Sequence, residues 1–178
     1  MSLVSEIETI ISQNHVDSDI SAAYRVRLKE GLLTRDENPR SHVCVYFIPV
    51  DVASRQVFIG HHKKSGLWLF NGGHVDPADE SLKVAILREM DEEWGFQKTP
   101  DDSPFLVTIT EITSNPAGRL CQWHFDISYK VPMDKSEVVF DPEKLATEFY
   151  ECHWMAIAEA QKLAKDPTTV QALTVLAV

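Results

Sequence analysis

The sequence predicts an α+β fold, in which helices pack against a mixed β-sheet. Segments with helical spacing of apolar residues and segments rich in β-branched and aromatic residues both occur along the chain. They do not alternate regularly, as they would in a doubly wound parallel sheet, so an α+β fold or an α/β sandwich is favoured. The length of 178 residues suggests one domain with at most a small appendage.

The N-terminal part predicts two helices followed by a polar break. Residues 3–13 and about 19–33 place apolar residues near helical spacing. The polar stretch 34–41 contains a proline and reads as a linker into the main domain. We therefore expect an N-terminal helical extension over residues 1–40 and the main domain over residues 41–178.

In the main domain, the sequence pattern predicts a sheet whose strands are interrupted by one long helix. The expected strands are residues 42–51, its hairpin partner 55–62, a short strand running into a glycine turn within 65–76, then 105–113, 120–131 and 149–155. A turn at residues 114–118 joins the fourth and fifth of these strands. The expected helices are residues 80–95 and 156–165, and a short apolar tail follows.

Composition and charge exclude several classes of protein. The net charge of -10 disfavours non-specific binding to nucleic acid or to an anionic membrane. No apolar stretch approaches the roughly 20 residues that span a bilayer, and the N-terminus lacks the basic region of a secretory signal. The three cysteines are odd in number and far apart, which argues against a disulfide framework and favours a reduced, cytoplasmic setting.

The expected helix at residues 80–95 crowds acidic side chains on one side. At about 100° per residue, Glu89, Glu92 and Glu93 share an arc of about 100°. This arc borders an apolar stripe made of Ile86, Leu87, Met90 and Trp94. Partial burial would raise the pKa values of these carboxylates unless a cation lies among them. Mg²⁺ suits such a site because it takes oxygen ligands and keeps waters that a phosphate can replace. A solvated helix face is the alternative.

The residues before this helix favour the metal site. The stretch "NGGHVD" places paired glycines directly after a strand, where the backbone can approach a ligand closely. A glycine turn that leads into an acidic helix is typical of a site for a metal ion and a phosphate.

Residues 73–96 resemble the signature of the Nudix hydrolases. That signature is Gly, five residues, Glu, seven residues, then Arg-Glu-apolar-any-Glu-Glu-any-Gly-apolar, and residues 88–96 match its second half in full. Seven residues separate Glu80 from Arg88, as in the signature, but six separate Gly73 from Glu80. We favour one inserted loop residue, because loops absorb length at low cost. The alternative is that Asp79 replaces the signature glutamate.

This resemblance implies a Nudix-type α/β/α sandwich with a mixed β-sheet and a small N-terminal helical extension, a layout similar to that of a group of bacterial Nudix proteins. It implies a pyrophosphohydrolase that holds Mg²⁺ or Mn²⁺ and cleaves a diphosphate linkage in a nucleoside diphosphate derivative by water attack. The expected partner is a small-molecule nucleotide or diphosphate substrate, with no nucleic acid and no membrane. A homodimer is compatible with the resemblance.

The resemblance also implies roles for individual residues. Glu92 and Glu93 would bind the metal, and Glu89 would be a further ligand or the base that activates water. The carbonyl group of Gly73, or that of Gly72, would complete the metal's shell. Glu80 and Arg88 would brace the loop and the helix by an ion pair. Family members often add a glutamate from outside the signature, and the candidates here are Glu111, Glu148 and Glu151.

Residues outside the signature are candidates for substrate contacts. His61, Lys63 and Lys64 lie in "GHHKKSG" and would bind a substrate phosphate, or else belong to a solvated hairpin turn. Strand alternation places His124 and Asp126 on one face of "CQWHFDISY", where they would line a pocket or face solvent.

The sequence also bears on three alternatives: a zinc site, a non-catalytic domain and an isomerase. His61, His62 and His74 suggest zinc, but we find no pair with structural-zinc spacing and do not expect it. A non-catalytic, nucleotide-sensing Nudix domain would not need the intact acidic cluster. Isopentenyl diphosphate isomerase has a Cys-Gly-His turn where this chain has Gly72, Gly73 and His74, so the isomerase thiol is missing.

Overall fold

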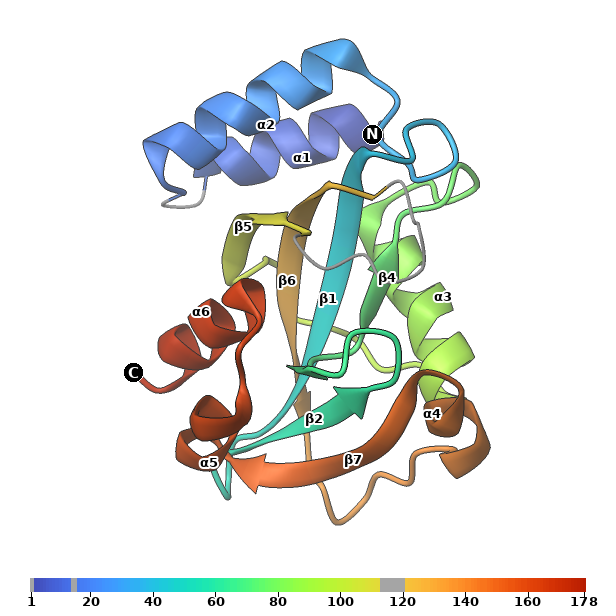
Figure 1. Ribbon diagram of the computed structural model, residues 1–178, viewed down its shortest axis with the longest axis vertical. Helices are drawn as coiled ribbons and strands as arrows, with labels where there is room; N and C mark the ends of the chain where they lie inside the picture. The colour runs from blue at the N-terminus through green and yellow to red at the C-terminus, as the bar shows by residue number, and fades with distance from the viewer. Residues whose placement is uncertain (1, 14–15, 113–120) are drawn as a thin grey trace.

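The computed structural model describes residues 2–13, 16–112 and 121–178, and these form six helices and a seven-stranded sheet (Figure 1). The helices are α1 (Leu3–Gln13), α2 (Ser18–Glu30), α3 (Leu82–Trp94), α4 (Pro142–Glu148), α5 (Ile157–Leu163) and α6 (Pro167–Leu176). The strands are β1 (Ser41–Asp51), β2 (Gln56–His62), β3 (Trp68–Leu69), β4 (Gly72–His74), β5 (Leu106–Glu111), β6 (Trp123–Met133) and β7 (Phe149–Ala156).

The sheet is mixed, with β1 at its centre. Its strand order is β3-β2-β1-β6-β5, while β4 also pairs with β1 and β7 also pairs with β2. The β1–β6 pairing is parallel along the whole of β1, and the other pairings are antiparallel. The expected hairpin of β1 and β2 is therefore present.

Helices cover both faces of this sheet (Figure 1). Val43, Val45 and Phe47 point to the side of α1, α2 and α3, where the larger hydrophobic core lies. Ile48 and Val50 point to the other side and pack with α5 and α6. Because successive strand residues face opposite ways, one strand supplies both cores. The arrangement confirms the predicted sandwich.

Most expected elements occur within a few residues of their predicted ends. Two short helices were missed: α4, and α6 in the segment that we expected to be an apolar tail. Both begin with proline after an aspartate whose side chain caps the helix, which is a recognised start signal. The expected glycine turn is instead strand β4, which pairs with β1. The turn expected at residues 114–118 lies outside the described residues.

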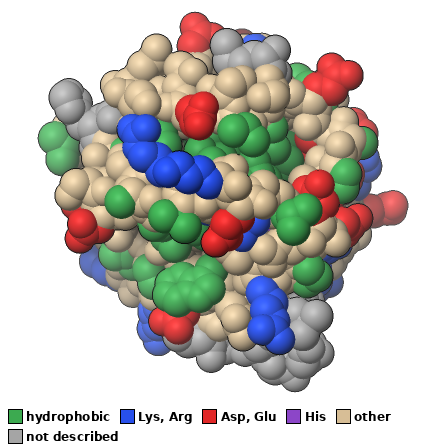
Figure 2. Space-filling model, turned by 90° about the horizontal axis from the view of Figure 1, so that it is seen from above, with side chains coloured by type: hydrophobic (Ala, Val, Ile, Leu, Met, Phe, Trp, Pro, Cys, Tyr) green, Lys and Arg blue, Asp and Glu red, His purple; other side chains and the backbone are tan. Residues whose placement is uncertain are grey.

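The surface and the helix lengths bear on the expected partners. Within the described residues, no helix is long and apolar enough to cross a membrane. Figure 2 shows the molecule from above, from the end where α1 and α2 lie in Figure 1. On this face, charged side chains of both signs are scattered among hydrophobic ones. Basic side chains do not dominate this face.

Helix α3 is fixed at both ends and along its apolar side. The Ser81 side chain accepts a hydrogen bond from the backbone N–H of Val84, and Gly95 ends the helix with a φ of 79°. Met90 and Trp94 are fully buried, which confirms the apolar stripe. The Trp94 ring meets Phe47 edge-on, with ring centroids 4.7 Å apart.

We expect Trp94→Ala to lower the free energy of unfolding by about 3–5 kcal/mol, because it leaves a large cavity between α3 and the sheet. Val84→Ala, on the solvent side of the same helix, should change it by less than about 0.5 kcal/mol. Urea denaturation measures both. A loss below about 1 kcal/mol for Trp94→Ala would contradict the packing described here.

Candidate active site

The carboxylates of α3 pack directly against the glycine backbone of β4. The Glu89 carboxylate lies so close to Gly73 that a Cβ atom there would collide with it. Glu93 is buried and accepts hydrogen bonds from the Asn71 side chain and from the backbone of Gly72. Any side chain at position 73 would therefore displace the Glu89 carboxylate from its place beside the strand.

Burial makes these carboxylates electrostatically costly. Burial raises the pKa of Glu93 to about 8, and the negative charge of Glu89 adds to this rise, against the hydrogen bonds from Asn71 and Gly72. Burial also raises the pKa of Glu89, while Arg88 opposes the rise. The buried carboxylates thus lack sufficient positive charge, and a divalent cation would supply it. The residues present fit a hard divalent ion.

Glu92 lies at the rim of this acidic group. Its side chain is 59% exposed, against 12% for Glu89. Arg88 spans the two, with Nη1 at 2.9 Å from Glu89 Oε1 and 3.3 Å from Glu92 Oε1. The three signature glutamates therefore lie together, two inside and one at the surface.

Arg88 is braced by Asp79 and not by Glu80. Its Nη2 lies 2.8 Å from Asp79 Oδ2, and its Nε lies 3.2 Å from Asp79 Oδ1. Arg88 Nη2 also donates to the carbonyl oxygen of His74 at 2.9 Å. Glu80 is exposed and forms no ion pair with Arg88 among the described residues, so the expected Glu80–Arg88 ion pair is wrong. Both Asp79 and Glu80 lie in the turn before Ser81, the residue that caps α3. This turn points the Asp79 side chain inward and leaves Glu80 at the surface.

A matched pair of substitutions tests this assignment. Asp79→Ala should lower the free energy of unfolding by about 2 kcal/mol, because it removes the two charged hydrogen bonds that the half-buried Arg88 donates to Asp79. Glu80→Ala should change it by less than about 0.5 kcal/mol. Thermal and urea denaturation measure both, and an equal or larger loss for Glu80→Ala would reverse the assignment.

The basic turn between β2 and β3 makes contacts within the protein. His61 Nε2 lies 3.1 Å from the carbonyl oxygen of Gly66, and the His61 ring stacks on Trp68. Lys63 donates to the carbonyl oxygen of Ala146, and Lys64 Nζ lies 2.6 Å from Glu148 Oε2. The turn is thus held against the end of α4.

Glu148 is the only one of the three extra-signature glutamates whose charge contributes to the raised pKa of Glu93. Its own pKa is lowered to about 2 by a hydrogen bond with His62 and by Lys64. Glu151 is exposed and lies 2.8 Å from His153, and Glu111 is exposed at the end of β5. Among the candidates, Glu148 lies best placed to act on the acidic cluster.

This lowered pKa predicts a specific pH dependence. Because the folded-state value of about 2 is below the ordinary 4.5, ionised Glu148 stabilises the fold above pH 4.5. That contribution disappears as the pH falls from 4.5 toward 2. Urea unfolding of the wild type and of Glu148→Gln should therefore differ most near neutral pH and converge in acid. Glu143→Gln, an exposed acid on α4, is the control, and an identical pH profile for both variants would contradict the interpretation.

The polar face of β6 is buried. His124, Asp126 and Ser128 share one face as expected, but α6 covers part of it, and Asp126 and Ser128 are fully buried. Asp126 Oδ2 accepts hydrogen bonds from Thr110 at 2.6 Å and from Thr168 of α6 at 2.9 Å. Burial raises the pKa of Asp126 to about 7. Neither Asp126 nor Ser128 faces solvent, because helix α6, where the sequence predicts only an apolar tail, folds over this face.

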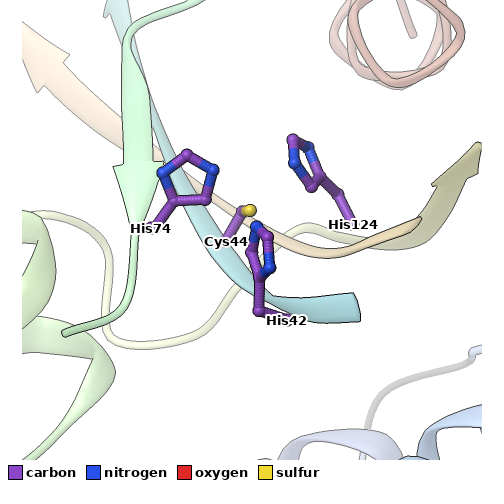
Figure 3. Close-up of side chains that lie close together, drawn as sticks. All are labelled: His42, Cys44, His74 and His124. Carbon is purple, nitrogen blue, oxygen red and sulfur yellow. The ribbon is translucent and has the colours of Figure 1, made fainter. Parts of the chain in front are cut away.

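One group of side chains was missed by the sequence analysis. His42, Cys44, His74 and His124 place one ligand atom each within 4.8 Å of one another (Figure 3). Of the three histidines weighed for zinc, only His74 belongs to this group. Only His42 and Cys44 of this group lie near each other in the sequence, so no local motif indicated it.

Comparison with known proteins identifies the family. Residues 38–174 match the family model described as NUDIX domain, so the chain belongs to the Nudix family and the resemblance is confirmed. No curated protein matches the chain.

Solved structures show the same fold at low identity. The MutT protein of Methanosarcina mazei is 19% identical with a TM-score of 0.58, and the match covers 79% of this chain and 93% of that one. A NUDIX hydrolase of Nitrosomonas europaea is 20% identical with a TM-score of 0.58, covering 76% and 87%. The NUDIX domain of Shewanella oneidensis NrtR, solved with ADP ribose, is 15% identical with a TM-score of 0.57, covering 76% and 85%.

Proposed function

We propose that this protein is a divalent-metal-dependent hydrolase that cleaves a diphosphate linkage in a nucleoside diphosphate derivative by water attack. The packing of Glu89 and Glu93 against Gly72 and Gly73 carries the proposal. Burying ionised carboxylates costs free energy. A cation bound between them and the glycine backbone would offset that cost. Family membership supports the same chemistry.

Glu89, Glu92, Glu93 and the carbonyl of Gly73 are the residues that would hold Mg²⁺ or Mn²⁺. When bound, the ion supplies positive charge for the diphosphate oxygens, which a chain of net charge -10 otherwise lacks.

The protein's own residues hold this arrangement in place. Asn71 fixes the Glu93 carboxylate by its side-chain amide. Arg88 links Glu89 on the helix to the carbonyl of His74 on β4, so helix and strand keep their distance when substrate charge arrives. Glu89, whose side chain is 12% exposed and lies next to Gly73, is the base candidate because its raised pKa favours proton acceptance from water. Diphosphate cleavage depends mainly on such positioning and charge neutralisation.

The NrtR neighbour favours a second candidate, a non-catalytic domain that binds a nucleotide derivative. In NrtR the NUDIX domain was solved with ADP ribose. The isomerase alternative loses support, since a Cβ atom at position 72 would lie 2.5 Å from the carbonyl oxygen of Val45. The nucleophilic cysteine of that enzyme would have no room there.

A small molecule is the proposed partner. The negative net charge and the mixed charges on the face in Figure 2 support this over a nucleic acid or an anionic membrane. A homodimer remains compatible with the proposal.

A panel of nucleoside diphosphate derivatives, assayed with and without Mg²⁺ or Mn²⁺, tests the function. We expect one class to be hydrolysed only with metal, and Glu93→Gln to lower kcat/KM at least about 100-fold. Asp91→Asn, on the exposed side of the same helix, is the matched control and should keep full activity. Tight, metal-independent nucleotide binding without turnover of any compound would support the non-catalytic candidate instead.

A further inference from the structure

Four side chains converge at one end of three neighbouring strands. His42 and Cys44 alternate along β1 and therefore share one face of the sheet. His124 of β6 lies opposite His42, and His74 of β4 lies opposite Cys44. The strand register alone thus brings together residues that are far apart in the sequence.

Their ligand atoms are close enough to share one ion. The three imidazole centroids lie 4.6 to 5.3 Å apart, grouped around the Cys44 sulfur (Figure 3). All four ligand atoms lie within 4.8 Å of one another. Ligand atoms around a tetrahedral zinc ion are about 3.3 to 3.8 Å apart, given Zn–N and Zn–S bonds of about 2.0 to 2.3 Å. Small side-chain rotations would close the set around an ion.

A fifth donor lies beside this group. Cys121 Sγ is 2.7 Å from His124 Nε2 and 3.4 Å from His42 Nε2. The Nε2 atoms of two histidines from different strands therefore face the same sulfur. A tetrahedral ion has four coordination positions, and five candidate ligands surround them. Three histidines and one thiol fill the four positions, and the second thiol remains beside the first.

His42 and His124 have the tautomer or the pKa that suits a metal ligand. His42 Nδ1 lies 3.0 Å from the carbonyl oxygen of Asn38, so this nitrogen donates its proton there and leaves Nε2 as the acceptor. His42 is fully buried, and burial lowers its pKa. Burial lowers the pKa of His124 to about 3. A lowered pKa favours the neutral imidazole, which is the form that binds metals.

We propose that His42, His74, His124 and a thiolate from Cys44 or Cys121 form a zinc site, separate from the carboxylates of α3. Imidazole and thiolate ligands select Zn²⁺ over Mg²⁺ or Mn²⁺, which prefer oxygen. Binding releases one thiol proton to solvent for each thiolate that coordinates the ion. The ion would link β1, β4 and β6, and its ligand on β4, His74, directly follows Gly73.

An ion bound at this site would hold strand β4 in place. The carbonyl of His74 accepts a hydrogen bond from Arg88, and the His74 side chain reaches the proposed ion on the sheet. A bound ion fixes the strand that carries Gly72 and Gly73 from the side opposite to α3.

Cobalt substitution tests the site without relying on activity. The full chain is freed of metal with a chelator and titrated with Co²⁺ in excess Mg²⁺, so that the oxygen ligands of α3 are already occupied. We expect one Co²⁺ per chain, with the visible absorption of tetrahedral cobalt and a sulfur-to-cobalt charge-transfer band, both abolished by one equivalent of Zn²⁺. Binding without a charge-transfer band would overturn the proposal.

Substitutions locate the ion. His124→Gln and His74→Gln should each weaken Co²⁺ and Zn²⁺ binding at least about 10-fold. The Cys44→Ser and Cys121→Ser pair identifies the thiolate, since only one of the two should remove the charge-transfer band. Cys152→Ser and His153→Gln lie outside the group and should bind normally, as should Glu92→Gln from the acidic cluster.

Circular dichroism confirms that each variant is folded before its metal binding is compared. His74 is only partly buried, so His74→Gln keeps the test valid if a buried position does not tolerate change. Unchanged cobalt spectra in folded His74→Gln and His124→Gln, or loss of the band in Cys152→Ser, would show that the ion binds elsewhere.

Discussion

The contact between the carboxylates of α3 and the glycine backbone of β4 is the constraint on which the rest of the site depends. Gly73 lacks the Cβ atom that would collide with Glu89, and Glu93 reaches the strand through Asn71 and Gly72. This closeness buries two carboxylates and raises their pKa values. It creates a place where negative charge and backbone oxygen meet, which is the chemistry of a hard divalent cation.

The sheet and its helices maintain that contact from two directions. On one side, Met90 and Trp94 anchor α3 in the main core, so the acidic side of the helix must face β4. On the other side, β1 holds β4 by backbone hydrogen bonds and carries His42 and Cys44 on its opposite face. Strand β1 thus supports two groups of different donor atoms, oxygen atoms near α3 and nitrogen and sulfur atoms near β6.

Much of this could be predicted from sequence, because local patterns determine it. The apolar stripe of α3 and the crowding of its carboxylates follow from helical periodicity, and residues 88–96 match the second half of the family signature in full. The partner of Arg88 could not be predicted in the same way. Whether Asp79 or Glu80 points inward depends on the turn before Ser81, where one residue changes the direction of a side chain.

Two other features depend on long-range pairing. The burial of Asp126 required α6 to fold over β6, which the apolar tail did not indicate. The histidine and cysteine group joins positions 42, 44, 74 and 124 through strand register, and no local spacing reveals a register between distant strands.

Anomalous diffraction from crystals soaked in Mn²⁺ would show whether an ion binds to the carboxylates of α3, because it locates the ion instead of inferring it from activity. We expect an anomalous peak between the carboxylates of Glu89 and Glu93 and the carbonyl of Gly73. No peak at these residues, with Mn²⁺ found only at exposed acids elsewhere, would contradict this expectation.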